Sequence, residues 1–159
     1  MSGKMPQTIV IPNDVFFASV CESLAEGRPV TFTVKGYSMF PFMRNEKDRV
    51  CVEMYDGRML AVGEVILFIY HGKHILHRIY SAEMSPDGRP LYRTMGDGNV
   101  RGVEYARPED ISGVMLKRIT PAGNEWYCNS VSWKIASSLW LRLLPVRRLL
   151  LAVLRRIRR

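Results

Sequence analysis

Residues 35–43 read Lys-Gly-Tyr-Ser-Met-Phe-Pro-Phe-Met and place a single hydroxyl, Ser38, between a glycine and a run of apolar side chains. The β-branched and aromatic run at 30–34 predicts a strand that ends just before this segment. Gly36 permits an unusual backbone path near the serine. A rigid bend of this kind can present a serine Oγ as a nucleophile. The alternative is a turn serine that bonds its own backbone.

A candidate general base lies in the segment His-Ile-Leu-His-Arg-Ile-Tyr at 74–80. If this segment is a strand, Ile75, His77 and Ile79 share one face of it because side chains alternate. Partial burial between two isoleucines disfavours the charged imidazole and keeps His77 neutral, which is the state a general base needs. The alternative is a packed histidine that is bonded to a carbonyl.

Two candidate carboxylates follow the predicted strand 90–95. The segment 94–104, Thr-Met-Gly-Asp-Gly-Asn-Val-Arg-Gly-Val-Glu, is a glycine-spaced bend that carries Asp97 and Glu104. A carboxylate in such a bend either caps the turn or orients a ring nitrogen elsewhere. Nucleophile, base and orienting acid are therefore all available in the chain.

A metal site is disfavoured although His71, His74 and His77 lie three residues apart. Strand alternation sends side chains at odd spacing to opposite faces. No thiol or paired carboxylate completes the set. We therefore expect no metal and no cofactor.

The elements that must position these residues are mainly strands. An amphipathic helix is predicted over 14–26, with Asn13 or Asp14 as its N-cap and Gly27 after its end. Short β-rich runs separated by glycine-containing turns then predict a mainly β fold. The predicted strands are 30–34, 49–55, 64–70, 74–80, 90–95 and 111–119.

Length and composition predict one compact body. A chain of 159 residues can bury enough surface to fold around one core. Its three cysteines form no C-x-x-C pair, and the first residues show no secretory leader. We therefore expect reduced thiols and a cytoplasmic protein.

The positive charge is concentrated in residues 133–159, which contain eight lysines and arginines and no acid. The chain has 23 basic and 15 acidic residues, so the preceding part is neutral, with 15 of each sign. Only this C-terminal tail needs a charged partner.

The order of these segments, over about residues 30–119, closely resembles the signal peptidase I and LexA-like superfamily of serine peptidases. The Ser-Met-x-Pro segment of that superfamily carries the nucleophile, which implies this role for Ser38. A later strand carries a lysine or, in the endoplasmic-reticulum and archaeal branch, a histidine, which implies that His77 is the base. The Gly-Asp-Gly-Asn segment at 96–99 is similar to a box near the active site of signal peptidases.

The resemblance has two departures. Signal peptidases usually have a serine two residues before the nucleophile, where this chain has Gly36, so oxyanion binding is left to backbone N–H groups such as that of Ser38. The endoplasmic-reticulum branch has aspartates after its box, where this chain has Gly102, Val103 and Glu104. The third catalytic residue is Asp97 or Glu104, and Asp97 is preferred because it lies in the glycine bend.

The predicted organisation is an N-terminal helical segment at 1–29, a signal-peptidase-like catalytic β-domain at 30–132, and an arginine-rich tail at 133–159. The expected activity is that of a serine endopeptidase acting on a peptide or protein, such as the leader of a small exported or modified peptide. The alternative is a non-catalytic or self-cleaving regulatory module on the same fold.

The tail is too often interrupted by arginine to span a bilayer, which takes ~20 apolar residues. Apolar residues recur at helical spacing with arginines on another side, which predicts an interfacial helix bent near Pro145. Peripheral contact with the inner face of the cytoplasmic membrane is expected. A helix docked on the body is the alternative, and nucleic acid is disfavoured because the body is not basic. The expected apolar face comprises Leu139, Leu143, Val146, Leu150, Val153 or Leu154, and Ile157.

Overall fold

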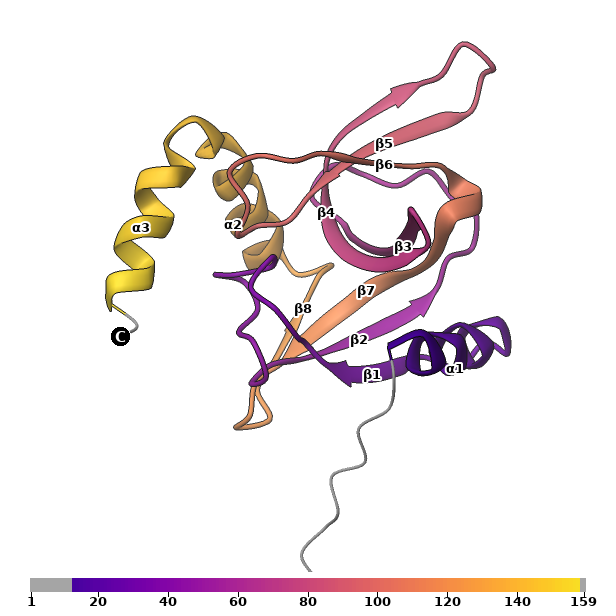
Figure 1. Ribbon diagram of the computed structural model, residues 1–159, viewed down its shortest axis with the longest axis horizontal. Helices are drawn as coiled ribbons and strands as arrows, with labels where there is room; N and C mark the ends of the chain where they lie inside the picture. The colour runs from indigo at the N-terminus through magenta and orange to yellow at the C-terminus, as the bar shows by residue number, and fades with distance from the viewer. Residues whose placement is uncertain (1–12, 158–159) are drawn as a thin grey trace, which may run out of the picture.

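An antiparallel sheet of eight strands forms the centre of the protein in a computed structural model that describes residues 13–157 (Figure 1). The strand order is β1-β2-β7-β3-β4-β5-β6, and β8 pairs with β7. The predicted mainly β fold is therefore confirmed. The strands are β1 Val30–Thr33, β2 Arg49–Met54, β3 Val65–Tyr70, β4 Lys73–Met84, β5 Pro90–Met95, β6 Glu104–Ala106, β7 Ile111–Ile119 and β8 Glu125–Tyr127.

Two hairpins fix the register of β4, the longest strand. A two-residue turn, His71-Gly72, joins β3 to β4, and both residues have positive φ. Such a turn follows the right-handed twist of the strands that it connects. Asp87 and Gly88 lie in the turn between β4 and β5. In this register His77 lies opposite Ile66 of β3, while Arg78 lies opposite Met95 of β5.

Helices lie at both ends of the sheet. Helix α1 (Asn13–Ala25) packs beside β1, whereas α2 (Val131–Arg142) and α3 (Arg147–Ile157) lie on the other side of the molecule (Figure 1). Ser130 caps α2 by accepting a hydrogen bond from Trp133 N. Two short 3-10 helices complete the chain, η1 (Pro108–Asp110) before β7 and η2 (Leu144–Val146) between α2 and α3.

The terminal helices share one hydrophobic core with the sheet. Leu24 of α1, Trp133 and Trp140 of α2, and Leu151 of α3 are all buried in the cluster that contains Met43. The three segments expected from the sequence therefore pack together through this core. Residues 1–12 and 158–159, which belong to the first and last segments, lie outside the described residues.

Most predicted elements are present within one or two residues of their expected bounds. The helix expected at 14–26 is α1, and the bend expected near Pro145 is η2. The strand expected at 74–80 continues to Met84 as β4. Two short strands, β6 and β8, were not predicted. The tail is divided between α2, whose inner face is buried, and α3.

Candidate active site

Ser38 lies in a turn that follows β1. Gly36, two residues earlier, has φ +90°, a conformation that favours glycine, and its N–H donates to Asn45 Oδ1 at 2.7 Å. Met39 and Phe42 follow the serine and are buried in the main core. The apolar side chains therefore hold the turn, while Ser38 itself stays partly exposed.

A groove of about 660 Å³ runs past Ser38 and His77. Helix α1 forms one wall, where Phe16 and Phe17 make edge-to-face contacts with Phe32 of β1, at centroid distances of 5.8 and 6.0 Å. Apolar and polar residues contribute equally to the lining, with seven of each. The lining residues are Asn13, Phe16, Phe17, Thr31, Phe32, Thr33, Val34, Lys35, Ser38, Met39, His74, Ile75, Leu76 and His77.

His77 is held by Glu104. Its side chain is only 7% exposed, and Nδ1 lies 2.9 Å from Glu104 Oε2. An ionised carboxylate can only accept, so Nδ1–H donates and the neutral ring carries its lone pair on Nε2. Glu104 Oε2 also accepts from the hydroxyl of Thr94 at 3.3 Å. The carboxylate thus fixes both the orientation and the tautomer of the imidazole.

Gly96 brings the histidine and the serine segment together. A Cβ on Gly96 would lie 2.5 Å from the Ser38 carbonyl oxygen and 3.0 Å from His77 Nε2. The Ser38 carbonyl also accepts from Gly98 N at 2.7 Å. The free ring nitrogen therefore lies close to the Ser38 backbone, and only a glycine fits between them.

The Ser38 hydroxyl and His77 Nε2 are not hydrogen-bonded to each other in the part of the chain that the structure describes. Nucleophile–base hydrogen bonds are often long in substrate-free enzymes and shorten when substrate binds. The Ser38 N–H has no partner among residues 13–157 either, so this donor is available to an oxyanion.

Within residues 13–157 the Asp97 carboxylate makes no hydrogen bond to His77, and of the two candidate carboxylates it is Glu104, not the preferred Asp97, that bonds the ring. Its carboxylate accepts from Arg78 Nε and Nη2, both at 2.8 Å. Both side chains are fully buried, at 0% and 1% exposure. Asp97 therefore holds a structural ion pair, and Glu104 occupies the position beside the ring.

Arg78 connects the sheet to α2. Its Nη1 donates to Gly63 O at 2.8 Å and to Ser137 Oγ at 2.6 Å. Its guanidinium lies over the rings of Phe42 and Trp133, 4.3 and 5.2 Å from their centroids. A buried arginine needs this many partners because its desolvation is costly.

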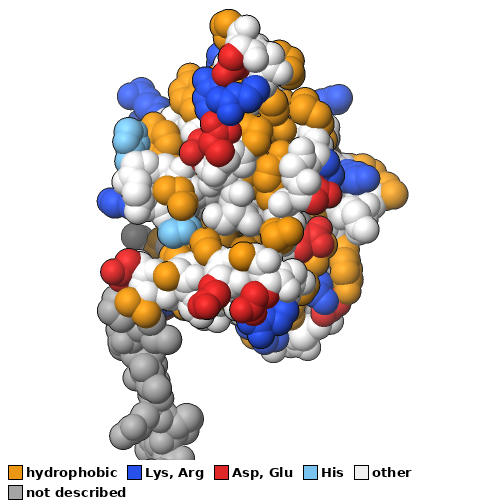
Figure 2. All heavy atoms as spheres, turned by 90° about the vertical axis from the view of Figure 1, so that its right-hand side faces the viewer, with side chains coloured by type: hydrophobic (Ala, Val, Ile, Leu, Met, Phe, Trp, Pro, Cys, Tyr) orange, Lys and Arg blue, Asp and Glu red, His pale blue; other side chains and the backbone are white. Residues whose placement is uncertain are grey.

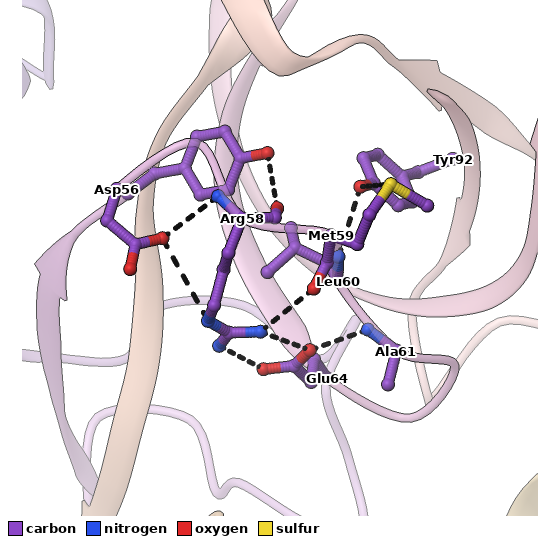
Figure 3. A network of polar contacts seen from close by, with 8 residues as sticks. Asp56, Arg58, Met59, Leu60, Ala61, Glu64 and Tyr92 are labelled. Atoms are coloured by element: carbon purple, nitrogen blue, oxygen red, sulfur yellow. Dashed lines mark hydrogen bonds and ion pairs between the residues drawn. The ribbon is translucent and has the colours of Figure 1, made fainter. Parts of the chain in front are cut away.

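The Gly63 carbonyl comes from a loop that is fixed by its own polar network (Figure 3). Arg58 forms a two-pronged ion pair with Glu64, at 2.6 and 3.0 Å. Leu60 N donates to the hydroxyl of Tyr92 at 3.1 Å, which ties the loop to β5. The loop therefore presents Gly63 O to Arg78 in a defined position.

The bend at 96–99 is also supported by the C-terminal helices. Trp140 Nε1 of α2 donates to Asp97 O at 3.2 Å, and Arg155 Nη2 of α3 donates to Gly98 O at 3.1 Å. Gly98 N in turn donates to Ser38 O. The bend thus lies between the serine turn on one side and two helices on the other.

A second ion pair fixes the chain after the serine turn. Asp48 is fully buried and accepts from Arg44 N at 2.8 Å and from its guanidinium at 2.7 Å. Burial alone would raise the pKa of Asp48, but the hydrogen bonds and charge of Arg44 outweigh it and hold this pKa below its ordinary value. The backbone of Asp48 pairs with Val34, so this turn closes onto the end of β1.

His74 is a second imidazole in the groove. It stacks on Phe17 at a centroid distance of 4.7 Å, and its Nε2 lies 3.5 Å from Cys21 Sγ. Burial lowers the pKa of His74, so the ring is neutral near pH 7.

Cys128 lies away from this groove. Burial raises the pKa of its thiol to about 12, which keeps the thiol protonated.

The three histidines do not converge. His71 packs edge-on against Tyr70 in the β3–β4 turn, whereas His74 and His77 have the separate partners given above. Within residues 13–157, no three His, Cys, Asp or Glu side chains lie close enough together to hold a metal ion.

Neither the known protein families nor the curated proteins give a match: no family model matches the chain, and no curated protein is significantly similar to it.

The role of Arg78 was missed by the sequence reasoning. Alternation along β4 already placed Arg78 on the face opposite His77. Leu76 on the same face indicates that this face is buried, and a buried arginine needs an acidic partner. Asp97, in the bend that follows the next strand, could serve as that partner. That signal could have assigned Asp97 to Arg78 and left Glu104 for His77.

Proposed function

We propose that the protein is a serine endopeptidase of the signal-peptidase-like type, with Ser38 as nucleophile, His77 as general base and Glu104 as the residue that orients the base. The observation that carries the proposal is the bond from His77 Nδ1 to Glu104, which leaves Nε2 free beside Gly96 and the Ser38 backbone. This arrangement supports a relay in which Glu104 orients His77 and His77 acts as the base for Ser38.

In the acylation step, Ser38 Oγ attacks the carbonyl carbon of the scissile peptide bond as His77 Nε2 takes the hydroxyl proton. The imidazolium that forms is stabilised by the Glu104 carboxylate, which lies 2.9 Å from Nδ1. When the tetrahedral intermediate collapses, the C–N bond breaks and Nε2 returns the proton to the leaving amine. The amine part of the peptide is then released, and the acyl part remains bound as an ester on Ser38.

The remaining steps use the same groups. The Ser38 N–H is the donor available to the negatively charged oxygen of the intermediate. Water attacks the ester and gives a proton to Nε2, which passes it to Ser38 Oγ as the acid product leaves. Glu104 stays ionised throughout and only stabilises the charged ring.

The groove indicates the substrate class. Its walls present Phe16, Phe32, Met39 and Leu76 to the same space as Ser38. A groove of this size with these apolar side chains in its walls accommodates a short stretch of extended chain with aliphatic side chains, which the hydrophobic effect would retain. We propose a peptide substrate of this kind, such as the leader of a small exported or modified peptide.

Labelling with a fluorophosphonate tests the proposal directly, because this reagent reacts with an activated serine. We expect one label on the intact chain, located at Ser38 by mass spectrometry, and none on Ser38→Ala. Cys21→Ser serves as the matched control, because Cys21 lies near the groove but has no role in the relay.

The alternative, a non-catalytic or self-cleaving module, predicts different outcomes. A self-cleaving chain would convert to two fragments on incubation, with a rate independent of its concentration. A chain that neither labels at Ser38 nor cleaves any member of a peptide library would contradict the peptidase proposal.

A further inference from the structure

Helix α2 has two contrasting faces. Its inner face buries Trp133, Ser137 and Trp140 against the body. Its outer face carries Val131 and Leu139, which are 73% and 54% exposed although both are apolar. With Ile135 between them, these side chains recur every four residues and form one stripe along the helix.

Exposed apolar side chains also occur in η2 and α3. Leu143 and Val146 are exposed in the connection, and Leu149, Val153 and Ile157 are exposed at four-residue spacing in α3. We call the eight residues the outer stripe. They are Val131, Ile135, Leu139, Leu143, Val146, Leu149, Val153 and Ile157.

The structure corrects the apolar face expected from the sequence. Leu150, which was assigned to the interfacial face, and Leu154, the alternative to Val153 there, pack against the main core instead. Leu149, which was not assigned, is 69% exposed. The alternative of a helix docked on the body is thus correct for the inner faces, while the outer stripe still faces outward.

The charged side chains of α2, η2 and α3 themselves all have one sign. Residues 131–157 contain no aspartate or glutamate. Lys134, Arg142, Arg148 and Arg156 are exposed on the same helices. Arg142 follows Leu139 by three residues and Arg156 follows Val153 by three, so both lie close to the stripe on their helices.

The acidic side chains of the other terminal helix lie away from this surface. Asp14, Glu22 and Glu26 are exposed on or just after α1. Figure 2 shows acidic side chains along α1, across the lower part of that face. Figure 1 shows α1 and α3 on opposite sides of the sheet. A negatively charged surface could therefore meet α2 and α3 without approaching α1.

The outer stripe is held in position by contacts on its inner side. Arg147 is buried at the start of α3, where it donates to Trp140 O at 3.2 Å and lies over the Trp140 ring. Leu151 is buried one turn later, and Arg155 bonds Gly98 O. The stripe therefore does not need a conformational change to become accessible.

We propose that the outer stripe and its arginines form a docking surface for a bilayer that contains anionic lipids. Exposed leucine, valine and isoleucine side chains enter the acyl region, while arginines reach the phosphates of the headgroups. A second copy of the chain is a poor occupant because it would bring arginines against arginines. Nucleic acid does not use a stripe of aliphatic side chains. No helix within the described residues is long and apolar enough to cross a bilayer, so the contact is peripheral.

Vesicle flotation with the full chain tests the proposal. Vesicles of phosphatidylcholine with 30% phosphatidylglycerol are compared with pure phosphatidylcholine, and we expect binding to the anionic vesicles that weakens in high salt. Leu149→Ser combined with Val153→Ser, and separately Arg148→Gln with Arg156→Gln, should each weaken binding by about tenfold or more. Ile69→Ser with Met84→Ser is the matched control, because these two residues are exposed and apolar but lie on the sheet.

The outcomes distinguish a bilayer from the other partners that the outer stripe could bind. Loss of binding in both helix variants at unchanged melting temperature, with the sheet control binding normally, supports the proposal. Equal flotation of all variants, or none by the unaltered chain, overturns it. Self-association that Leu149→Ser abolishes, or capture of an acidic helical peptide without vesicle binding, also overturns it. Ser38→Ala should float normally, so this test is independent of the proposed peptidase activity.

Discussion

His77 and Arg78 are neighbours on β4, yet they form ion pairs of very different character. His77 meets Glu104 at the groove, and its Nε2 has no partner within the described residues. Arg78 meets Asp97 in the interior, and its nitrogens donate to two carboxylate oxygens, a carbonyl and a hydroxyl. The first pair retains one free nitrogen and the second retains none. Both pairs contain a carboxylate. The candidate catalytic pair differs from the structural one because its histidine keeps a nitrogen lone pair that can accept a proton.

The largest expected effect follows from loss of the nucleophile or the base. Ser38→Ala and His77→Ala should each lower kcat/KM for peptide cleavage by ~10³ to 10⁶, and the double variant should be hardly worse than either. Groups that act in one relay lose their effect together. Steady-state kinetics on all three variants, at equal melting temperature, provide the measurement, and multiplying losses would contradict a shared relay.

The second effect separates the two carboxylates. Glu104→Gln should lower turnover by up to ~10⁴-fold, because the amide no longer stabilises the charged ring. Its melting temperature should change little, since Glu104 is partly exposed. Asp97→Asn should instead lower the melting temperature. If both variants are folded and Asp97→Asn lowers turnover more than Glu104→Gln, then Asp97 and not Glu104 is the residue that orients His77.

The third effect concerns stability. Arg78→Met should lower the free energy of unfolding by about 3–5 kcal/mol, because it leaves the Asp97 carboxylate buried without its cation. Combining it with Asp97→Leu should recover much of this loss, since the unpaired charge is then removed. Urea denaturation gives both values. His77→Gln, at the adjacent residue, is the control. If it lowers the free energy of unfolding as much as Arg78→Met, the two pairs do not differ in their contribution to stability.

The smallest effect concerns the neutral histidine of the groove. Burial lowers the pKa of His74, so the unfolded chain binds a proton at this residue more readily than the folded one. The contribution of His74 to stability is therefore full above the unfolded pKa and is lost as pH falls through the folded value. We expect His74→Gln to lose less melting temperature than the unaltered chain between pH 7 and 5. A steeper loss in the variant would show that the ring gains a proton on folding.

The sequence carried enough information to place Ser38 and His77 on the correct elements. The strand at 74–80 and the turn after 30–34 depend on local chemistry, and both are present in the structure. The choice between Asp97 and Glu104 was not local. It depends on which face of the sheet each carboxylate meets, and this is set by β6, a three-residue strand that pairs Glu104 with Thr94.

The tail illustrates the same limit. Its 3.6-residue periodicity correctly predicted helices and a bend at Pro145. Periodicity alone could not tell which side is buried, because apolar residues occupy both sides. Trp133 and Trp140 decide the orientation of α2 by filling the core beside Phe42, and Leu151 decides that of α3.

The serine turn and His77 can approach each other because Gly96, which lies between them, has no Cβ. Even an alanine there would place its methyl carbon 2.5 Å from the Ser38 carbonyl and 3.0 Å from His77 Nε2, so one of the two segments would have to move. A larger residue at this one position would separate the serine from the histidine while every chemical group remained present. The geometry of the candidate site therefore depends on the side chain that residue 96 lacks as much as on the groups that Ser38, His77 and Glu104 carry.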